Sequence, residues 1–158
     1  MSVERVREYL KQFGAEGRIL EFPVSSATVE LAAAAVGTEP ARIAKTLSFL
    51  VGEDCVLVVA AGDARIDNRK FKDFFHTKAK MPTAEQVLER VGHPVGGVCP
   101  FDVAEDVAVY LDRSLQRFDT VFPAAGSGSS AIELDCDELF RFSRARGWID
   151  VCKLPEPI

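Results

Sequence analysis

Apolar and polar positions along the first part of the chain recur with two different periods. Residues 3–13 carry apolar side chains at helical spacing and predict a helix. The segment 18–24 alternates and runs into a proline, which predicts a short strand. Thr28 is a favourable N-cap residue, so we expect a second helix through the run VELAAAAV that follows it.

The centre of the chain predicts a hairpin followed by two helices. The runs 45–51 and 55–61 are rich in β-branched and apolar residues and are joined by a short polar turn, as in a β-hairpin. Asp67 can cap a helix that carries three phenylalanines. Thr83 and Gln86 have the spacing of a capping box, which predicts the next helix.

The C-terminal part predicts three strands, a helix and a last strand. Asp135 and Glu138 form a second capping box, which opens a helix that we expect to end at Gly147. The stretch WIDVC (148–152) predicts an edge strand. The three strand candidates before the helix are VAVYLD (107–112), FDTVFPAA (118–125) and SAIELD (130–135).

This order of elements lacks the regular strand–helix alternation of a doubly wound sheet. Runs of strands and runs of helices are typical of α+β domains. No repeat, low-complexity tract or linker divides the chain. We therefore predict a single α+β domain over residues 1–158, with a mixed, mostly antiparallel sheet that is curled like part of a barrel and flanked by helices.

The composition is that of a globular protein. Of 158 residues, 47% are hydrophobic and 27% are charged. No apolar run approaches the ~20 residues that a membrane helix needs. The first residues, MSVERVREYLKQF, are amphipathic and lack the apolar core of a signal peptide. We therefore expect a cytoplasmic protein without a membrane partner.

The charge is negative overall and uneven along the chain. The net charge of −5 argues against a protein that coats nucleic acid non-specifically, since such proteins are usually basic. Residues 65–80, however, hold six Lys or Arg against two Asp. This segment is either a phosphate-facing patch or the solvated face of a helix, and the charge pattern alone leaves both open.

Cysteine and histidine provide no recognisable metal or disulfide pattern. The four cysteines are widely spaced without a C-x-x-C pair, and the two histidines are seventeen positions apart. We therefore expect reduced thiols and no metal. Cys99 as a nucleophile would need a base or an electropositive setting, which the sequence does not reveal, so a buried structural thiol is the favoured reading. His93 precedes a proline and is expected to be a loop or cap residue.

Three other features are candidates for a binding site. Gly96 and Gly97 lie between two prolines, so their bare amides could bind a carbonyl or oxyanion; an ordinary tight turn is the alternative. Lys45 begins an apolar strand and is either a solvent-facing end residue or a cation at a pocket rim. The GSGSS stretch at 126–130 lacks a phosphate-loop pattern, and a flexible hairpin that could border a pocket is favoured.

Five stretches carry distinctive motifs in a fixed order. They are ARIAKTLSF (41–49), AAGDARIDNRKF (60–71), GHPVGGVCPF (92–101), VYLDRSL (109–115) and AAGSGSSAIEL (124–134). Together they resemble the YbaK/EbsC family, the aminoacyl-tRNA deacylases related to the editing domain inserted in bacterial prolyl-tRNA synthetase. The resemblance runs from about residue 3 to 152, and the Lys-Thr strand start and the G-x-x-x-P loop are its strongest marks.

This resemblance implies hydrolysis of a mischarged aminoacyl-tRNA bound by its acceptor end, with prolyl-tRNA synthetase as a candidate partner and no metal or cofactor. It implies that Lys45 contacts the terminal adenosine or the ester, and that amides of the loop from Gly96 to Pro100 hold the substrate carbonyl. The basic segment supplies four candidate tRNA contacts, Arg65, Arg69, Lys70 and Lys72. The residues expected to bind the substrate are Thr28, Thr46, Gly97, Val98, Pro100, Ala124, Gly126 and Ser127.

The chemistry that the resemblance implies needs no protein nucleophile. An aminoacyl ester is already activated, so positioning and oxyanion stabilisation could suffice. The attacking group would be a water helped by the ribose hydroxyl of the substrate or, for a cysteinyl substrate, the substrate's own thiol. This would explain why the sequence shows neither a protein nucleophile nor a base.

Two positions differ from family members of known specificity. Cysteine-specific members carry a serine where this chain has Ala124, and alanine-specific members carry a histidine near the Gly-Ser loop, where this chain has serines. We expect cysteine or a similarly small amino acid on tRNA(Pro) as the first choice, with alanine less favoured. The alternative hypotheses are a non-catalytic module that binds a tRNA end or small ligand, and a thiol enzyme that uses Cys99.

Overall fold

The computed structural model describes residues 2–23, 28–93 and 98–155. None of the helices in these ranges is long and apolar enough to cross a membrane. The helices are α1 (Ser2–Leu10), α2 (Val29–Val36), α3 (Asn68–Phe75), α4 (Ala84–Val91) and α5 (Cys136–Ser143). The strands are β1 (Ile19–Glu21), β2 (Ile43–Val51), β3 (Asp54–Ala61), β4 (Arg65–Ile66), β5 (Ala108–Asp112), β6 (Thr120–Pro123), β7 (Ser130–Ile132), β8 (Leu134–Asp135), β9 (Trp148–Ile149) and β10 (Cys152–Lys153).

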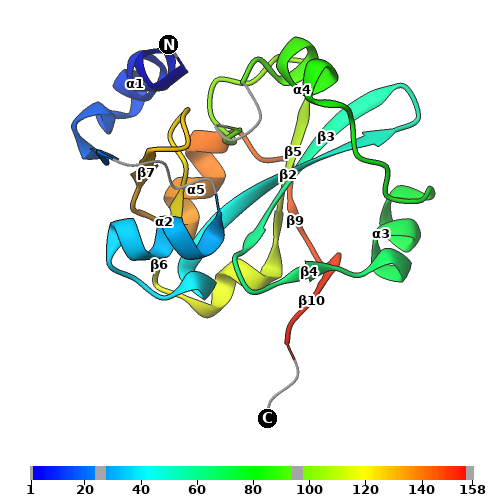
Figure 1. Cartoon of the computed structure of the whole chain (residues 1–158). Coiled ribbons are helices and arrows are strands. Elements are labelled where there is room, and N and C mark those ends of the chain that lie inside the picture. Colours follow the sequence, from blue (N-terminus) through cyan, green and yellow to red (C-terminus); the bar gives the residue numbers. More distant parts are fainter. Residues whose placement is uncertain (1, 24–27, 94–97, 156–158) are drawn as a thin grey trace.

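The β2–β3 hairpin is the centre of a six-stranded sheet with the order β8-β6-β2-β3-β5-β9 (Figure 1). Two further pairs, β1–β7 and β4–β10, are antiparallel two-stranded sheets. The described strands make seven pairings, of which four are antiparallel and three parallel. The predicted α+β fold with a mixed, curled sheet is therefore confirmed.

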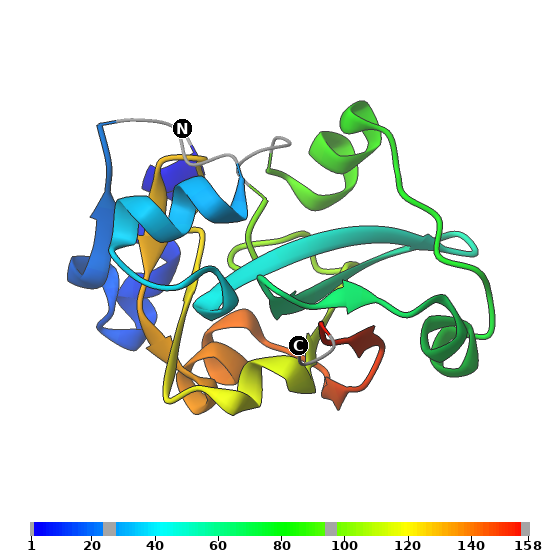
Figure 2. The same cartoon turned by 60° about the horizontal axis from the view of Figure 1, so that its bottom comes forward.

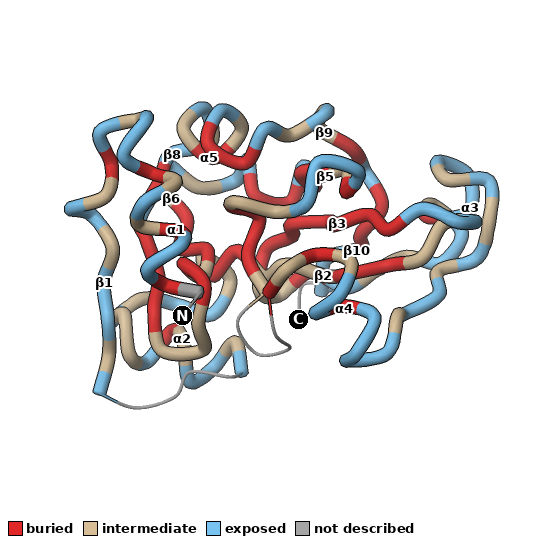
Figure 3. Tube along the Cα trace, turned by 90° about the horizontal axis from the view of Figure 1, so that it is seen from above, coloured by how far each residue is buried: buried red, intermediate tan, exposed pale blue. Residues whose placement is uncertain are grey.

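The segments predicted as consecutive strands after residue 106 lie on both sides of this hairpin. β5 runs parallel to β3, whereas β6 runs parallel to the start of β2. β3 is consequently enclosed between two strands and is buried along nearly its whole length (Figure 3). Among the described residues, β6 is the strand that pairs with the outer side of β2, and it reaches only the first two residues of β2. This difference between β2 and β3 determines where the site can form.

The predicted caps are confirmed, because a cap depends on residues within one helical turn. The Thr28 hydroxyl accepts the Leu31 N–H at the start of α2. The Asp67 carboxylate accepts two N–H groups at the start of α3. Both capping boxes, Thr83 with Gln86 and Asp135 with Glu138, are formed.

Three predicted elements have wrong boundaries. The edge strand predicted at 148–152 is divided into β9, which pairs with β5, and β10, which pairs with β4. α5 ends at Ser143 rather than at Gly147, because Arg144 adopts the left-handed conformation and the following residues run along the sheet. The Arg146 N–H donates to Val109 O there, and Trp148 pairs with β5. The strand predicted at 130–135 is divided, since β7 pairs with β1 and β8 pairs with β6.

An aromatic cluster fixes α3 against the hairpin. The Phe71 ring is fully buried and lies 4.9 Å from the Phe49 ring of β2 and 4.5 Å from the Phe75 ring, between centroids. Phe75 in turn meets Tyr110 of β5 at 5.4 Å. Burial of a side chain as large as Phe71 stabilises the fold by roughly 1.5–3 kcal/mol. α3 therefore lies near the turn end of the hairpin, away from α2 (Figures 1 and 2).

Candidate functional site

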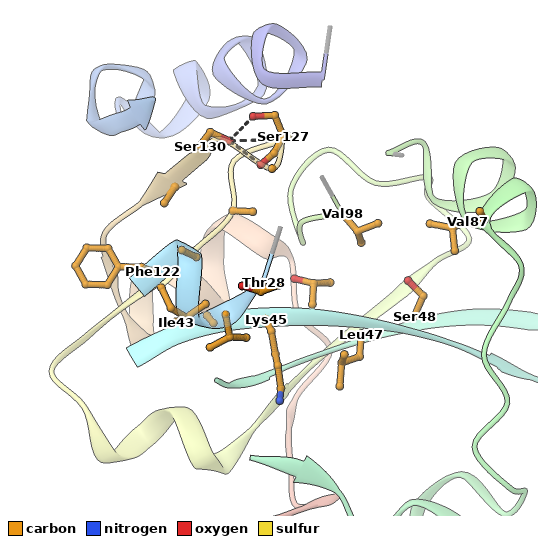
Figure 4. A pocket seen from close by; sticks show the side chains of 18 of the residues that line it. Thr28, Ile43, Lys45, Leu47, Ser48, Val87, Val98, Phe122, Ser127 and Ser130 are labelled. Atoms are coloured by element: carbon orange, nitrogen blue, oxygen red, sulfur yellow. Dashed lines mark hydrogen bonds between the residues drawn. The ribbon is translucent and has the colours of Figure 1, made fainter. Parts of the chain in front are cut away.

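A cavity of about 460 Å³ lies where the outer edge of β2 has no neighbouring strand (Figure 4). The start of α2, the β6–β7 connection, the residues that lead into α4, and Val98 form its other walls. The wall is mainly apolar, with Ile43, Leu47 and Phe122 among its side chains. Lys45 is the one charged residue among the lining residues that the structure describes. Such a cavity suits a ligand that is held by shape and by a few hydrogen bonds.

Two side chains of β2 supply hydroxyl groups to this cavity. Ser48 is 8% exposed and points to the same side of the strand as Ser127 (Figure 4). Thr46 lies two residues earlier, so its side chain is on the same face of the strand. The Thr46 Oγ1 atom is buried and has no hydrogen-bond partner among the described residues. A buried polar atom without a partner costs free energy, which makes Thr46 a candidate ligand contact.

Lys45 borders the cavity, but its ammonium is directed to the other side of β2 (Figure 4). The Nζ atom donates to the carbonyl oxygens of Gly62, at 3.3 Å, and Ala64. Burial of the side chain lowers the pKa of Lys45. In this arrangement the ammonium joins the start of β2 to the turn after β3.

The Gly-Ser connection between β6 and β7 holds its serines in a hydrogen-bond network. The Ser130 hydroxyl accepts the N–H groups of Ala125, at 3.3 Å, and Ser127, at 3.2 Å. The Ser127 hydroxyl donates to Ser130 Oγ at 3.1 Å. Gly126 has a φ of 104°, which few residues other than glycine adopt, and so allows the chain to turn here. The connection borders the cavity, one of the possibilities left open by the sequence.

Most of the substrate-binding residues expected from the sequence come together at this cavity. Gly126 and Pro100 are buried and lie within two residues of Ser127 and Val98, which line the cavity, but they are not part of its wall themselves. Gly96 and Gly97 lie outside the described residues. The expected residues that line the cavity are Thr28, Lys45, Thr46, Val98, Ala124 and Ser127.

Sequence reasoning missed other parts of the wall. Ser48 is separated from Thr46 by one residue and was hidden within an apolar run. Its period-two relation to Thr46 was the available signal. Met81, Pro82 and Val87 approach the cavity only through the tertiary fold, so no local pattern could have placed them there.

His93 and Cys99 form a sealed pair, a proximity that sequence spacing did not reveal. Both are 0% exposed, and Cys99 Sγ lies 3.7 Å from His93 Nε2. The same Nε2 atom lies 2.7 Å from Phe101 O, and because a carbonyl only accepts, Nε2 must carry the proton and donate it. It cannot then accept the thiol proton. Burial raises the pKa of Cys99 to about 12 and lowers that of His93, which argues against a thiolate nucleophile.

The four candidate tRNA contacts lie on and just before α3. Arg65, Arg69 and Lys72 are exposed, and none has a side-chain partner among the described residues. Lys70 is different, because its Nζ atom donates to Asp150 Oδ1 and Cys152 O, both at 3.0 Å. Three of the four cations are therefore available to an anionic partner, and Lys70 is held within the protein.

Known proteins resemble this chain over most of its length. A relative in Bacillus subtilis (strain 168), "Uncharacterized protein YwhH", is 54% identical over 97% of this chain and 98% of its own length. Proline--tRNA ligase of Latilactobacillus sakei is 31% identical over 56% of this chain, a region that makes up 16% of the ligase. A solved structure described as "a putative trans-editing enzyme for prolyl tRNA synthetase" superposes with a TM-score of 0.86 at 29% identity, covering 99% of this chain and 98% of its own.

The family model that matches the chain covers most of the elements around the cavity. It describes an aminoacyl-tRNA editing domain and matches residues 24–142, a range that includes β2, the Gly-Ser connection and the G-x-x-x-P loop. The resemblance noted in the sequence is thereby confirmed, and the chain belongs to the aminoacyl-tRNA editing domain family.

Proposed function

We propose that this protein is a stand-alone deacylase that hydrolyses mischarged aminoacyl-tRNA, with tRNA(Pro) carrying cysteine or another small amino acid as substrate. Membership of the editing family supports the reaction class. The observation that carries the proposal is the cavity at the edge of β2, where the unpartnered Thr46 hydroxyl and the expected substrate-binding residues meet.

The size of the cavity suits more than an amino-acid side chain. Its volume of about 460 Å³ lies within the range of roughly 300–1,000 Å³ that is common for small-molecule sites. A small aminoacyl group fills only part of this space, which leaves room for ribose and base of the terminal adenosine. The apolar wall can pack against the base, while Thr28, Ala124 and Ser127 surround the aminoacyl group.

The proposed reaction depends on positioning. Amides of the Gly96–Pro100 loop hold the ester carbonyl and stabilise the oxyanion that develops on it. A water helped by the ribose hydroxyl attacks the carbonyl carbon, or the substrate's own thiol does so in a cysteinyl ester. Because Cys99 is sealed against His93 and Phe101, no role in the attack falls to a protein thiol.

Lys45 has two connected roles in this proposal. Its stem borders the cavity, and its ammonium contacts the terminal adenosine or the ester when substrate is bound. In the structure the ammonium lies on the other side of β2 and donates to the Gly62 and Ala64 carbonyls, so contact with the substrate requires the side chain to turn toward the cavity and release these bonds. The desolvated setting of the lysine strengthens its interaction with an incoming anionic or carbonyl oxygen.

A deacylation panel tests the proposal. Wild type and Lys45→Ala are incubated with tRNA(Pro) carrying cysteine, alanine or serine, and with correctly charged Pro-tRNA(Pro) as the control. The proposal predicts hydrolysis of at least one mischarged tRNA and a loss of about 100-fold in Lys45→Ala, as removal of an electrostatic contact to a transition state produces. Thermal melting of the variant checks that the fold persists.

Two results would contradict the proposal in different ways. Binding of charged tRNA without turnover across the panel would identify a non-catalytic module. Full activity of Lys45→Ala would remove Lys45 from the catalytic site while leaving the reaction itself in place.

A further inference from the structure

The outer edge of β2 has a gap in its pairing that coincides with the cavity. At one end, β6 pairs with only the first two residues of β2. The chain then leaves this edge, because the Ala125 N–H is donated to Ser130 Oγ. At the other end, the Leu50 N–H donates to Lys80 O at 2.7 Å. Between these points, no backbone group of the described residues outside the hairpin pairs with β2.

A proline keeps one side of this gap open. Pro82 follows the segment that bonds to Leu50, and it lacks the N–H that continued pairing toward Ser48 would require. On this side the gap is therefore built into the sequence.

The main-chain groups of Thr46 and Ser48 face this gap. Along an antiparallel pair, the N–H and C=O of one residue point to the partner strand and those of the next point away. The Leu50 N–H points away from β3, since it bonds to Lys80. The same orientation recurs two and four residues earlier, so Ser48 and Thr46 each present one donor and one acceptor to the cavity.

An ammonium group bound in the cavity would find only uncharged oxygen acceptors among the described lining residues. These described lining residues include no carboxylate, and their one charged side chain, Lys45, is itself a cation. An ammonium in the cavity must therefore donate to hydroxyl or carbonyl oxygens. The two edge carbonyls, at Thr46 and Ser48, are acceptors with no backbone partner among the described residues.

We propose that the aminoacyl group binds to this edge as a one-residue β-strand, and that the site thereby recognises a free α-amino group. An aminoacyl group has the N–Cα–C=O connectivity of a peptide residue. Its ammonium can donate to a carbonyl of Thr46 or Ser48, while its ester carbonyl accepts an N–H from the same edge. The inference rests on the proposed function and adds which part of the substrate the site binds.

The strand-like pairing leaves the ester carbonyl able to accept a second hydrogen bond. A carbonyl oxygen has two lone pairs, and the N–H of the β2 edge occupies one of them. The pairing also leaves the amino-acid side chain perpendicular to the sheet, as in any strand. N-acylation removes the positive charge and two of the three donors, so the site should discriminate against aminoacyl groups with a blocked amine.

Three stable amide analogues of the terminal nucleoside test this pairing on the full-length wild-type protein. They are 3′-deoxy-3′-(glycylamino)adenosine, its N-acetylglycyl counterpart and 3′-acetylamino-3′-deoxyadenosine, which keeps the carbonyl without the amine. Glycine has no side chain, so the result does not depend on which amino acid is edited. Binding is followed by the backbone amide resonances in ¹H–¹⁵N spectra.

The glycyl compound should bind about tenfold or more tightly than either of the others, as expected for a charge-assisted hydrogen bond. Its titration should shift the Thr46 and Ser48 amide resonances. The ladder residues Leu47 and Phe49 are the internal control. Without ligand, their amides should exchange with solvent more slowly than those of Thr46 and Ser48, because they bond to β3.

Equal affinity of the three compounds, binding that leaves the Thr46 and Ser48 amides unmoved, or no binding of the glycyl compound would overturn the inference. None of these outcomes depends on hydrolysis. Failure of the proposed function is a separate result, in which no mischarged tRNA of the deacylation panel is hydrolysed even though the glycyl compound binds as predicted.

Discussion

The His93–Cys99 pair contains the more reactive side chains, but the open edge of β2 is the region that a ligand can reach. The pair contains the residue types most often associated with catalysis, yet both side chains are 0% exposed and the His93 Nε2 proton is directed to Phe101 O. The edge contains a threonine and a serine of ordinary reactivity. Its Thr46 hydroxyl is buried without a partner among the described residues, beside a cavity of about 460 Å³.

This difference shows that access to a cavity marks the site better than residue type does. The Nδ1 atom of His93 is also buried without a hydrogen-bond partner among the described residues, but His93 does not line the cavity, whereas Thr46 does. Burial raises the pKa of Cys99 to about 12, which makes the thiol inert at neutral pH. At the edge, hydrogen-bonding capacity is left over after folding, which costs stability unless a ligand uses it. An activated ester needs a binding and polarising surface of this kind more than it needs a nucleophile.

A larger side chain in the cavity should lower activity, whereas a larger side chain at the neighbouring core position should lower stability. Ala124 lines the cavity, whereas Ala125 is 0% exposed within the core. Ala124→Leu should lower deacylation by about 100-fold with little change in stability, since misplacement of a substrate by about 1 Å costs this much. Ala125→Leu should instead destabilise the fold by roughly 1–3 kcal/mol through overpacking. Urea unfolding and single-turnover deacylation of both variants check this pair.

Removing the unpartnered hydroxyl should separate stability from activity. Thr46→Val keeps the shape of the side chain but deletes Oγ1, so the free energy of unfolding should rise by about 1 kcal/mol. Deacylation should fall by about tenfold, because the substrate loses a hydrogen bond. Urea unfolding and deacylation rates measure the two effects. A variant that is both less stable and fully active would show that the hydroxyl serves the fold.

The smallest expected effect concerns the exposed cations near α3. Arg69→Glu should weaken tRNA binding severalfold and flatten the slope of log K against log salt by about one unit, as expected for one lost phosphate contact. Arg141→Glu on α5, a helix that lies away from α3 (Figure 1), is the matched change of charge, because Arg141 is also exposed and has no ion pair among the described residues. Filter binding at several salt concentrations compares them. If the slopes of log K against log salt are identical for the two variants, the basic segment is a solvated surface that does not contact tRNA phosphates.

Features that depend on neighbouring residues were predictable from the sequence, and those that depend on distant contacts were not. The caps at Thr28 and Asp67 follow from side chains beside their own helix starts. The hairpin of β2 and β3 follows from two β-rich runs around a turn. The end of α5 was mispredicted because Arg144, with φ 54°, takes the left-handed conformation usually adopted by glycine.

The candidate site was predictable in part for the same reason. The motif resemblance supplied Thr46 and Ser127, which the fold brings to one cavity from distant parts of the chain. Ser48 shares the strand face of Thr46, but the sequence does not show that β6 leaves β2 after two residues and so leaves this part of the edge beside a cavity. The proximity of His93 and Cys99 was missed because it arises from the tertiary fold and not from a spacing that a sequence pattern reveals. The expected amides of Gly96 and Gly97 remain a prediction.

The most direct test of the account is deacylation of Cys-tRNA(Pro) by the Cys99→Ser variant measured beside the wild type. The account places the reaction at the β2 edge without a protein thiol, so both proteins should release cysteine at rates that agree within about twofold. This twofold limit is far smaller than the loss of several orders of magnitude in rate that is expected when a covalent nucleophile is removed. A wild type that hydrolyses none of the mischarged tRNAs of the panel, or a loss of that size in a folded Cys99→Ser variant, would contradict it.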